Sequence, residues 1–213
     1  MNPFSALNDA HSKCAFLPQS LQGYSSSITP WSEIQTAEEK ASAVALLFLL
    51  PRTESGRVAR IVLTRRSSRV RTHKGQIGFA GGRREPGDAT PADTMLREVH
   101  EEIGIQPSDI LVHGMLAPRV SIDGSMVVPV FATSEIDETL MQPAADEVAA
   151  IHLCDWVNFK RSAGTRFGFT IFGIRRESWL FNHSPLKKLN DSSDQNPLVW
   201  GLTAEILAQA DMR

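Results

Sequence analysis

The chain has 213 residues, and 22 Lys plus Arg stand against 24 Asp plus Glu, which gives a formal net charge of −2. This length suits one domain with a sizeable core, and the balanced charge argues against nucleic acid or an anionic membrane as a partner. No run approaches the ~20 apolar residues of a membrane span. The two cysteines, Cys14 and Cys154, make no disulfide framework. Since the N-terminus also lacks the regions of a signal peptide, we expect a reducing, cytoplasmic location.

The first part of the chain predicts an arm followed by the start of a sheet. Residues 1–40 are polar and mixed, and we expect them to form an N-terminal arm with one helix near Thr29–Lys40. Residues 41–213 are expected to form a single domain. Within it, the apolar run Ala43–Leu50 is typical of a strand buried on both faces. Arg52–Gly56 predicts a turn, and Arg60–Thr64 predicts the partner strand.

A basic loop follows at Arg65–Lys74, with the sequence RRSSRVRTHK. By itself such a loop is as easily a solvated charged surface as a binding site. Arg66, Arg71 and Lys74 suit phosphate groups, because arginine binds them through two hydrogen bonds and lysine acts as a point charge. His73 either orients the loop, contacts a substrate or is a structural histidine, and the sequence favours none of these roles.

The next segment predicts a strand, a loop and a helix in that order. In Gln76–Ala80 polar and apolar residues alternate as in a partly buried strand, and Gly81–Asp88 has the glycines, charges and Pro-Gly pair of a loop. The helix Thr90–Gly104 begins with a threonine N-cap, has proline at its first position and Asp93 three residues after the cap, and ends at a glycine. Its buried stripe is predicted to contain Ala92, Met95, Leu96, Val99 and Ile103.

The polar side of this helix carries Glu98, Glu101 and Glu102, at spacings of three and four. This spacing places three carboxylates within one turn, and like charges so close destabilise a helix. A solvated acidic face is the ordinary explanation of such a run. A divalent cation explains it better in this setting, because Mg²⁺ and Mn²⁺ prefer hard oxygen ligands. Arg97, four residues before Glu101, is placed to pair with it.

The rest of the chain predicts further sheet and a closing helix. Pro129 is expected at an edge position or a bulge, because proline cannot donate to a strand ladder, and Trp200 is expected in the core. Glu147, in a short Asp-Glu-Val element, is on sequence alone an ordinary exposed acid. The predicted elements are strands at Ile110–Leu116 and Met126–Phe131, a turn at Ser121–Gly124, a polar loop at Thr133–Ala145 that is a candidate lid, a hairpin from Phe167–Phe172 and Glu177–Phe181, a polar loop at Asn182–Pro197 and a helix at Leu198–Ala210.

Two motifs carry a resemblance to a known family. The Gly-Gly pair, Asp88 and the sequence REVHEEIG resemble the Nudix box, a Gly-loop-helix signature whose helix ends in RExxEExG. The spacing from Asp88 to Arg97 is one residue longer than is usual in that family. The upstream sequence LTRRSSRVRTHKGQIGFAGG, from Leu63 to Gly82, resembles the signature LTxRSxxxRxHxGQIxFPGG of the coenzyme A pyrophosphatase branch, which has the same longer loop. Ala80 stands where that branch has proline, which affects loop stiffness more than chemistry.

The resemblance covers about residues 40–210, since the closing WGLTAEIL is similar to WGxTAxIL of the same branch. It implies an α/β fold, namely a Nudix-type α/β/α sandwich with a mixed β-sheet and the Nudix loop-helix. It also implies an enzyme that uses Mg²⁺ or Mn²⁺ to cleave the diphosphate of coenzyme A or acyl-CoA. The products would be 3′,5′-ADP and 4′-phosphopantetheine or its acyl form.

The resemblance further implies roles for individual residues. The metal ligands would be Glu98, Glu101 and Glu102 with the carbonyl of Gly82, and Glu147 would add a carboxylate to the cluster or act as the base. Either Glu98 or Glu147 would take the proton of the attacking water, while Arg97 would orient the glutamates. The basic loop, with Arg66, Arg71, His73 and Lys74, would bind the substrate's phosphates.

Three other functions stay open at this stage. The chain could hydrolyse another nucleoside diphosphate derivative, such as ADP-ribose, a dinucleoside polyphosphate or a nucleoside triphosphate. It could be a non-catalytic nucleotide-binding module, although the intact Glu98, Glu101 and Glu102 argue against this. An RNA-processing Nudix enzyme is disfavoured by the neutral charge balance. Members of the family are often homodimers, which makes a second copy of the chain a possible partner.

Overall fold

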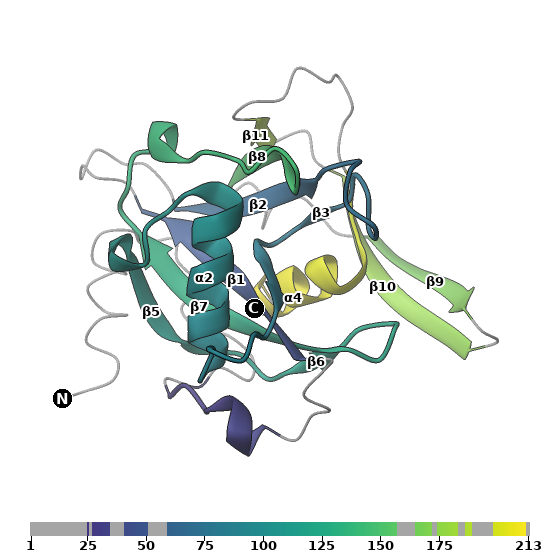
Figure 1. The fold of residues 1–213 in the computed structure, drawn as a ribbon. Coiled ribbons are helices and arrows are strands. Elements are labelled where there is room, and N and C mark those ends of the chain that lie inside the picture. The colour runs from purple at the N-terminus through teal and green to yellow at the C-terminus, as the bar shows by residue number, and fades with distance from the viewer. Residues whose placement is uncertain are drawn as a thin grey trace.

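The computed structural model describes residues 25, 27–34, 41–50, 59–156, 165–171, 174–182, 186–188 and 198–211. A nine-stranded mixed sheet forms the middle of the molecule, in the order β11-β8-β2-β1-β7-β5 with three short strands beside this path (Figure 1). β1 and β7 run parallel, and the other pairs are antiparallel. The strands are β1 (Ala41–Leu49), β2 (Arg60–Arg66), β3 (Ile77–Gly78), β4 (Gly81–Arg83), β5 (Ile110–Met115), β6 (Arg119–Val120), β7 (Met126–Ser134), β8 (Val148–Asp155) and β11 (Leu186–Lys188).

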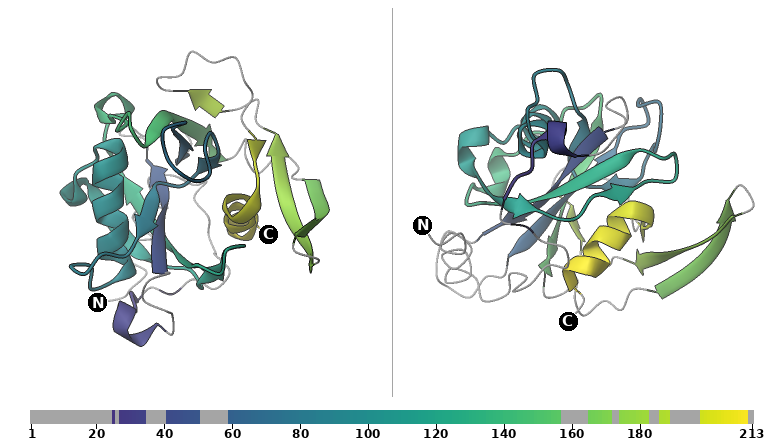
Figure 2. Two further views of the ribbon diagram at one scale, coloured as in Figure 1. Left: turned by 45° about the vertical axis from the view of Figure 1, so that its right-hand side comes forward. Right: turned by 90° about the horizontal axis from the view of Figure 1, so that it is seen from below.

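Two helices cover the two faces of this sheet. Figure 2 shows α2 (Pro91–Ile103) on one side and α4 (Gly201–Asp211) on the other. β1 contributes side chains to the core on both faces of the sheet, because successive side chains of a strand point to opposite faces. Leu46 and Phe48 pack in the cluster that contains α4 residues, and Leu47 and Leu49 pack in the cluster that contains α2 residues. The predicted α/β/α arrangement, with a strand buried on both faces, is confirmed.

A second, three-stranded sheet lies beside α4 (Figure 1, Figure 2). It consists of β9 (Thr165–Ile171), β10 (Ile174–Asn182) and β12 (Leu198–Val199). β9 and β10 pair antiparallel from Ile171 opposite Ile174 onward, which confirms the predicted hairpin. None of the helices in the described segments is long and apolar enough to cross a membrane.

Of the predicted helix near Thr29–Lys40, the structure describes residues 29–34. Within these, Pro30 has an extended ψ of 150°, and Trp31–Glu33 form one helical turn, the 3-10 helix η1. Trp31 is 2% exposed and its indole N–H donates to the Thr94 hydroxyl at 3.1 Å, which anchors this turn on α2. The remainder of the predicted helix, residues 35–40, lies outside the described residues, as do the predicted turn at Arg52–Gly56 and residues 1–24.

The predicted surroundings of two residues are wrong, namely the edge or bulge position of Pro129 and the core position of Trp200. Pro129 is neither at an edge nor at a bulge, because β7 is flanked by β1 on one side and by β5 and β6 on the other. The Pro129 carbonyl accepts from the Leu116 N–H at 2.8 Å. The irregularity in the pairing of β5 with β7 lies elsewhere, between Val112 and Gly114 on β5. Trp200 is 40% exposed, because the helix begins only at Gly201 and the preceding residues pair with β10.

Other boundaries also shift through pairing between distant segments. The predicted strand Gln76–Ala80 is reduced to β3, although Ile77 and Phe79 are buried. The predicted turn at Ser121–Gly124 is confirmed, with the Gly124 N–H donating to the Ser121 carbonyl at 3.0 Å. β7 extends to Ser134, and η4 (Glu138–Leu140) interrupts the polar loop after it. The predicted loop Asn182–Pro197 contains β11, which pairs with β8.

Candidate active site

The helix α2 is set in place by the local signals that the sequence predicts. The Thr90 hydroxyl accepts from the Asp93 N–H at 3.2 Å, and the Asp93 carboxylate accepts from the Thr90 N–H at 2.8 Å. Gly104 ends the helix with a left-handed φ of 76°. Of the predicted stripe, Leu96 is only partly buried, and the other four residues, Ala92, Met95, Val99 and Ile103, are buried. This face packs against β1, β4, β7 and β8.

The three glutamates of α2 lie in three different environments. Glu102 is 2% exposed, the Glu98 side chain is 13% exposed and the Glu101 side chain is 55% exposed. The prediction that all three stand on the polar side is therefore wrong for Glu102. The physical reason is the 3.6-residue turn, which sets Glu101 and Glu102 about 100° apart, with Glu98 between them in direction. Glu102 consequently faces the sheet and Glu101 faces outward.

The Gly-Gly pair forms strand β4 rather than the predicted loop, and it lies against these carboxylates. Gly81 and Gly82 pair with Val44 and Ala43 of β1. Gly81 has a φ of 152°, and a Cβ there would lie 2.7 Å from the Val44 Cα. A Cβ on Gly82 would lie 2.6 Å from the Glu98 Cδ. The Gly81 N–H donates to Glu102 Oε2 at 3.4 Å. Only glycines permit this approach of backbone and carboxylate.

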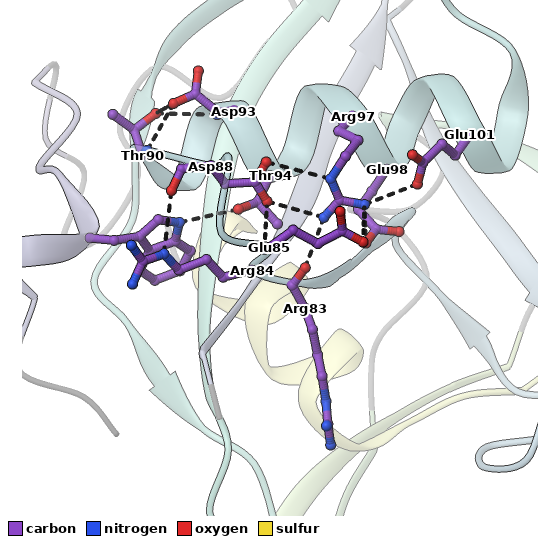
Figure 3. A network of polar contacts seen from close by, with 11 residues as sticks. Arg83, Arg84, Glu85, Asp88, Thr90, Asp93, Thr94, Arg97, Glu98 and Glu101 are labelled. Atoms are coloured by element: carbon purple, nitrogen blue, oxygen red, sulfur yellow. Dashed lines mark hydrogen bonds and ion pairs between the residues drawn. The ribbon is translucent and has the colours of Figure 1, made fainter. Parts of the chain in front are cut away.

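Arg97 connects the glutamates to the loop before the helix (Figure 3). Its Nη1 donates to Glu98 Oε1 at 3.0 Å and to Glu101 Oε2 at 2.9 Å, as the predicted orienting role requires. Its Nη2 donates to the Arg83 carbonyl at 2.8 Å and to Asp88 Oδ2 at 3.1 Å. Burial alone would lower the pKa of Arg97, but its carboxylate partners raise it. Arg97 therefore stays charged and fixes two side-chain rotamers.

Asp88 is a structural residue of the site that the sequence-based assignment of roles leaves out. Asp88 is 6% exposed and accepts from Arg97 and, at 2.9 Å, from the Glu85 N–H. Burial acts to raise the pKa of Asp88, but these hydrogen bonds outweigh it and lower that pKa. The signal was present in the sequence, since Asp88 is the loop acid of the Nudix-like motif. Its function is to hold Arg97.

The buried carboxylates carry an electrostatic cost. Burial raises the pKa of Glu102 to about 8, and Glu98 and Glu147 add to this shift, whereas Arg66 opposes it. Burial also raises the pKa of Glu98, where Arg97 acts in the opposite direction and Glu101 and Glu147 reinforce the rise. Each carboxylate therefore destabilises the charged form of its neighbours, which is the condition that a bound cation relieves.

Arg66, at the start of the basic loop, reaches the buried Glu102. Val62 and Arg66 are an even number of positions apart on β2, and Val62 packs in the cluster of α2, so Arg66 points to the α2 face. Its Nη1 lies 3.8 Å from Glu102 Oε1. The other predicted phosphate-binding residues, Arg71, His73 and Lys74, are exposed. His73 has a left-handed φ of 58°, and its Nδ1 lies 2.9 Å from Gln76 Oε1.

Glu147 comes to the site on a turn after the predicted lid. The Gln142 N–H donates to the Ile103 carbonyl at 3.0 Å and the Ala144 N–H donates to the Glu102 carbonyl at 2.9 Å, so the loop is fastened to the end of α2. Glu147 itself is exposed, but its charge raises the pKa of both Glu98 and Glu102. Glu147 is thus close enough for its charge to act on both of these carboxylates.

The carboxylates of this site are of the type that binds a hard divalent cation, although they are not gathered around a single position. Within the described residues, no group of three Asp, Glu, His or Cys side chains is gathered closely enough to hold a metal ion. Glu101 is turned to Arg97 and Glu102 to the Gly81 N–H. Two features would nevertheless suit Mg²⁺ or Mn²⁺. The Gly82 backbone lies close to the Glu98 carboxylate, and the carboxylates repel one another, which a bound cation would relieve. The residues present therefore fit such an ion.

Comparison with known proteins places this chain in a family. A model of the NUDIX domain matches residues 40–168. The chain therefore belongs to the Nudix family, as the sequence motifs indicate. It is a Nudix pyrophosphohydrolase, an enzyme that hydrolyses phosphorus-containing anhydrides. Nudix hydrolases generally use divalent metals such as Mg²⁺ or Mn²⁺.

Individual relatives show the range of similarity. A Pectobacterium atrosepticum protein described as an uncharacterized Nudix hydrolase, NudL, is 34% identical over 150 residues, which cover 70% of this chain and 72% of that protein. The human mitochondrial coenzyme A diphosphatase NUDT8 is 30% identical over 177 residues, covering 80% of this chain and 70% of its own length. Among solved structures, a MutT/nudix family protein from Enterococcus faecalis is 15% identical with a TM-score of 0.49, covering 83% of this chain and 62% of that one.

Proposed function

We propose that this protein is a Mg²⁺- or Mn²⁺-dependent hydrolase that cleaves the diphosphate of coenzyme A or acyl-CoA. The observation that carries the proposal is the pair of carboxylates formed by the buried Glu102 and the partly buried Glu98, with Arg66 of the basic loop 3.8 Å from Glu102. Carboxylates suit the cation and the basic side chains suit phosphates. The likeness to a human coenzyme A diphosphatase at 30% identity supports this substrate.

In this mechanism the chain supplies binding, orientation and a base. When bound, the cation would neutralise the diphosphate and lower the pKa of a water molecule that attacks phosphorus. Glu98, Glu101 and Glu102, with the Gly82 carbonyl, are the residues proposed to hold it. Glu98 or Glu147 takes the proton of the attacking water, and Arg97 keeps Glu98 in its rotamer.

The basic loop gives a reason for preferring a CoA-type substrate. Coenzyme A carries a 3′-phosphate in addition to its diphosphate, so it presents more negative charge than ADP-ribose. Arg71, His73 and Lys74 are exposed on the loop that follows Arg66, and arginine pairs with phosphate through two charge-assisted hydrogen bonds. We assign the 3′-phosphate to these exposed residues and the diphosphate to the region of Arg66.

The test is a turnover assay with Mg²⁺ and then Mn²⁺ on separate substrates. Coenzyme A, an acyl-CoA, ADP-ribose, a diadenosine polyphosphate and a nucleoside triphosphate are offered one at a time. The proposal expects 3′,5′-ADP to appear from coenzyme A with a kcat/KM well above that for the others. A preference for ADP-ribose or the polyphosphate would replace the substrate assignment. Turnover of none of them would favour a nucleotide-binding role.

Substitution of metal ligands tests the site itself. Glu101→Gln and Glu102→Gln each remove a proposed ligand charge while keeping the shape of the side chain, so turnover should fall by about two orders of magnitude or more. Glu33→Gln, an exposed acid on η1, is the matched control and should leave turnover unchanged. Full activity of both ligand variants would contradict the assignment.

A further inference from the structure

The segment after β2 contacts the turn that carries Glu147 at two points. The Ser67 N–H donates to the Glu147 carbonyl at 2.7 Å, and Ser67 is 5% exposed. Arg69 Nη1 donates to Asp146 Oδ1 at 2.7 Å, between side chains that are 69% and 87% exposed. The Ser67 hydroxyl accepts from the Arg69 N–H at 3.2 Å, which links the two contacts. We call Ser67, Arg69, Asp146 and the Glu147 backbone the loop bridge.

A β-bulge sets up this contact. Arg65 lies opposite Ala150 and Arg66 opposite Val148, so Ala149 is an extra residue on β8. Without the bulge, Ala149 would lie opposite Arg66. Val148, Glu147 and the residues before them would then each lie one position further along the segment that follows β2. Bulges next to active sites often re-aim side chains in this way. Here the bulge puts Glu147 opposite Ser67 instead of one position further along.

The turn that carries Glu147 is held from its other side as well. The Ala144 N–H donates to the Glu102 carbonyl at 2.9 Å, and the N–H groups of Glu147 and Val148 donate to the Ala144 carbonyl at 2.9 and 2.8 Å. Glu147 is therefore an exposed side chain on a backbone fixed between the end of α2 and β2. Unlike the three glutamates of α2, Glu147 has a backbone that is hydrogen-bonded to the segment after β2.

We propose that Arg69 and Asp146 are positioning residues: their ion pair, with the Ser67 hydrogen bond, holds Glu147 near the carboxylates Glu98 and Glu102 and couples it to the basic loop. This inference rests on the proposed function for the role of Glu147. Arg69 thereby differs from the exposed Arg71 and Lys74 of the same loop, because its charge is directed to the Asp146 carboxylate and not to substrate phosphate.

A charge exchange tests the pairing without substrate. Mn²⁺ binding is measured by titration calorimetry for the wild type, Arg69→Asp, Asp146→Arg and the double variant that carries both changes. Each single change should weaken Mn²⁺ binding about two- to fivefold, which is what an exposed ion pair supplies, and the double variant should recover wild-type affinity. Arg60→Ala, which breaks the ion pair with Glu138 at the other end of β2, is the control and should bind Mn²⁺ normally.

Kinetics then separate positioning from substrate binding. With the substrate that the wild type turns over, the single variants should lose about two- to fivefold in kcat with an unchanged KM. In a Glu147→Gln background the same changes should have no further effect. A raised KM in Arg69→Asp that Asp146→Arg does not restore would overturn the proposal in favour of phosphate binding. Wild-type Mn²⁺ affinity in both single variants would overturn it outright. Failure of the wild type to cleave coenzyme A bears only on the proposed substrate, since the metal titration is independent of it.

Discussion

At the scale of single residues, Glu102 shows how the site opposes folding. Burial raises its pKa from 4.5 to about 8, so the folded state keeps a proton that the unfolded state releases between these pH values. The stability contributed by this group is therefore complete below about pH 4.5 and is lost as pH rises through 8. Glu102→Gln removes this loss. We compare the unfolding free energy of Glu102→Gln with that of the wild type, with metal chelated. The difference in favour of the variant should be roughly 3–5 kcal/mol larger at pH 9 than at pH 4.

Urea denaturation at the two pH values measures this difference, with Glu33→Gln as a control that should show none. Equal effects of Glu102→Gln at both pH values would mean that the folded protein already holds Glu102 ionised at neutral pH. Added Mg²⁺ should reduce the gap at high pH in the wild type, because an ion that binds only the folded state stabilises it.

The two glycines of β4 allow a second comparison between neighbouring residues. A methyl group on Gly81 would meet backbone, 2.7 Å from the Val44 Cα, at a φ of 152° that side chains rarely adopt. A methyl group on Gly82 would meet the Glu98 side chain, which can move. Gly81→Ala should therefore lose about 2 kcal/mol or more of stability. Gly82→Ala should lose much less stability but should lose turnover, because Glu98 is displaced.

Thermal denaturation and turnover of the two variants, measured side by side, check this division. The reverse pattern, with an inactive but stable Gly81→Ala and an unstable but active Gly82→Ala, would show that β4 does not pack on β1 as described. The comparison is sharp because both substitutions add the same methyl group to adjacent residues.

At the scale of elements, α2 is stabilised by its ends as well as by its buried face. The Thr90 hydroxyl and the Asp93 carboxylate each satisfy an N–H that the first turn of the helix leaves unpaired. Thr90→Ala should cost about 1 kcal/mol of unfolding free energy. Thr72→Ala, at an exposed loop position, is the matched control and should cost almost nothing. Equal stability of the two variants in urea would show that packing alone holds the helix.

The same distinction explains what the sequence could predict. The start, end and buried stripe of α2 depend on residues within a few positions, and these predictions are correct except that Leu96 is only partly buried. The strand β4 could not be predicted, because Gly81 and Gly82 become a strand only through pairing with β1, far away in sequence. Trp200 is exposed and Pro129 is interior for the same reason, since pairing between distant segments sets their surroundings.

Part of the site was predictable on the same grounds. Glu98, Glu101, Glu102 and Arg97 lie within two successive turns of one helix, so their grouping follows from spacing. The close approach of the Gly81 and Gly82 backbone to these carboxylates does not, because it depends on the pairing of β4 with β1. The contact between the Glu147 turn and the basic loop was equally hidden, because it depends on the bulge in the pairing of β2 with β8.

At the scale of the whole molecule, β1 links the two cores, so the α2 face and the α4 face should unfold together. Cys154 on β8 reports on this, because it is fully buried and burial raises the pKa of its thiol to about 12. In a Cys14→Ser background it is the sole cysteine. A reagent that reacts with thiolates should label Cys154 at least about a thousandfold more slowly in the folded protein than in the unfolded chain.

Labelling rates measured across a series of low urea concentrations decide how Cys154 becomes accessible. If the whole sheet must open, the rate should rise with urea with the slope of global unfolding. Ser68→Cys, at an exposed loop position, is the control and should react at once in the native protein. A rate independent of urea would contradict cooperative unfolding. It would instead indicate local separation of β11 from β8, where Leu186 lies opposite Cys154 at the edge of the sheet.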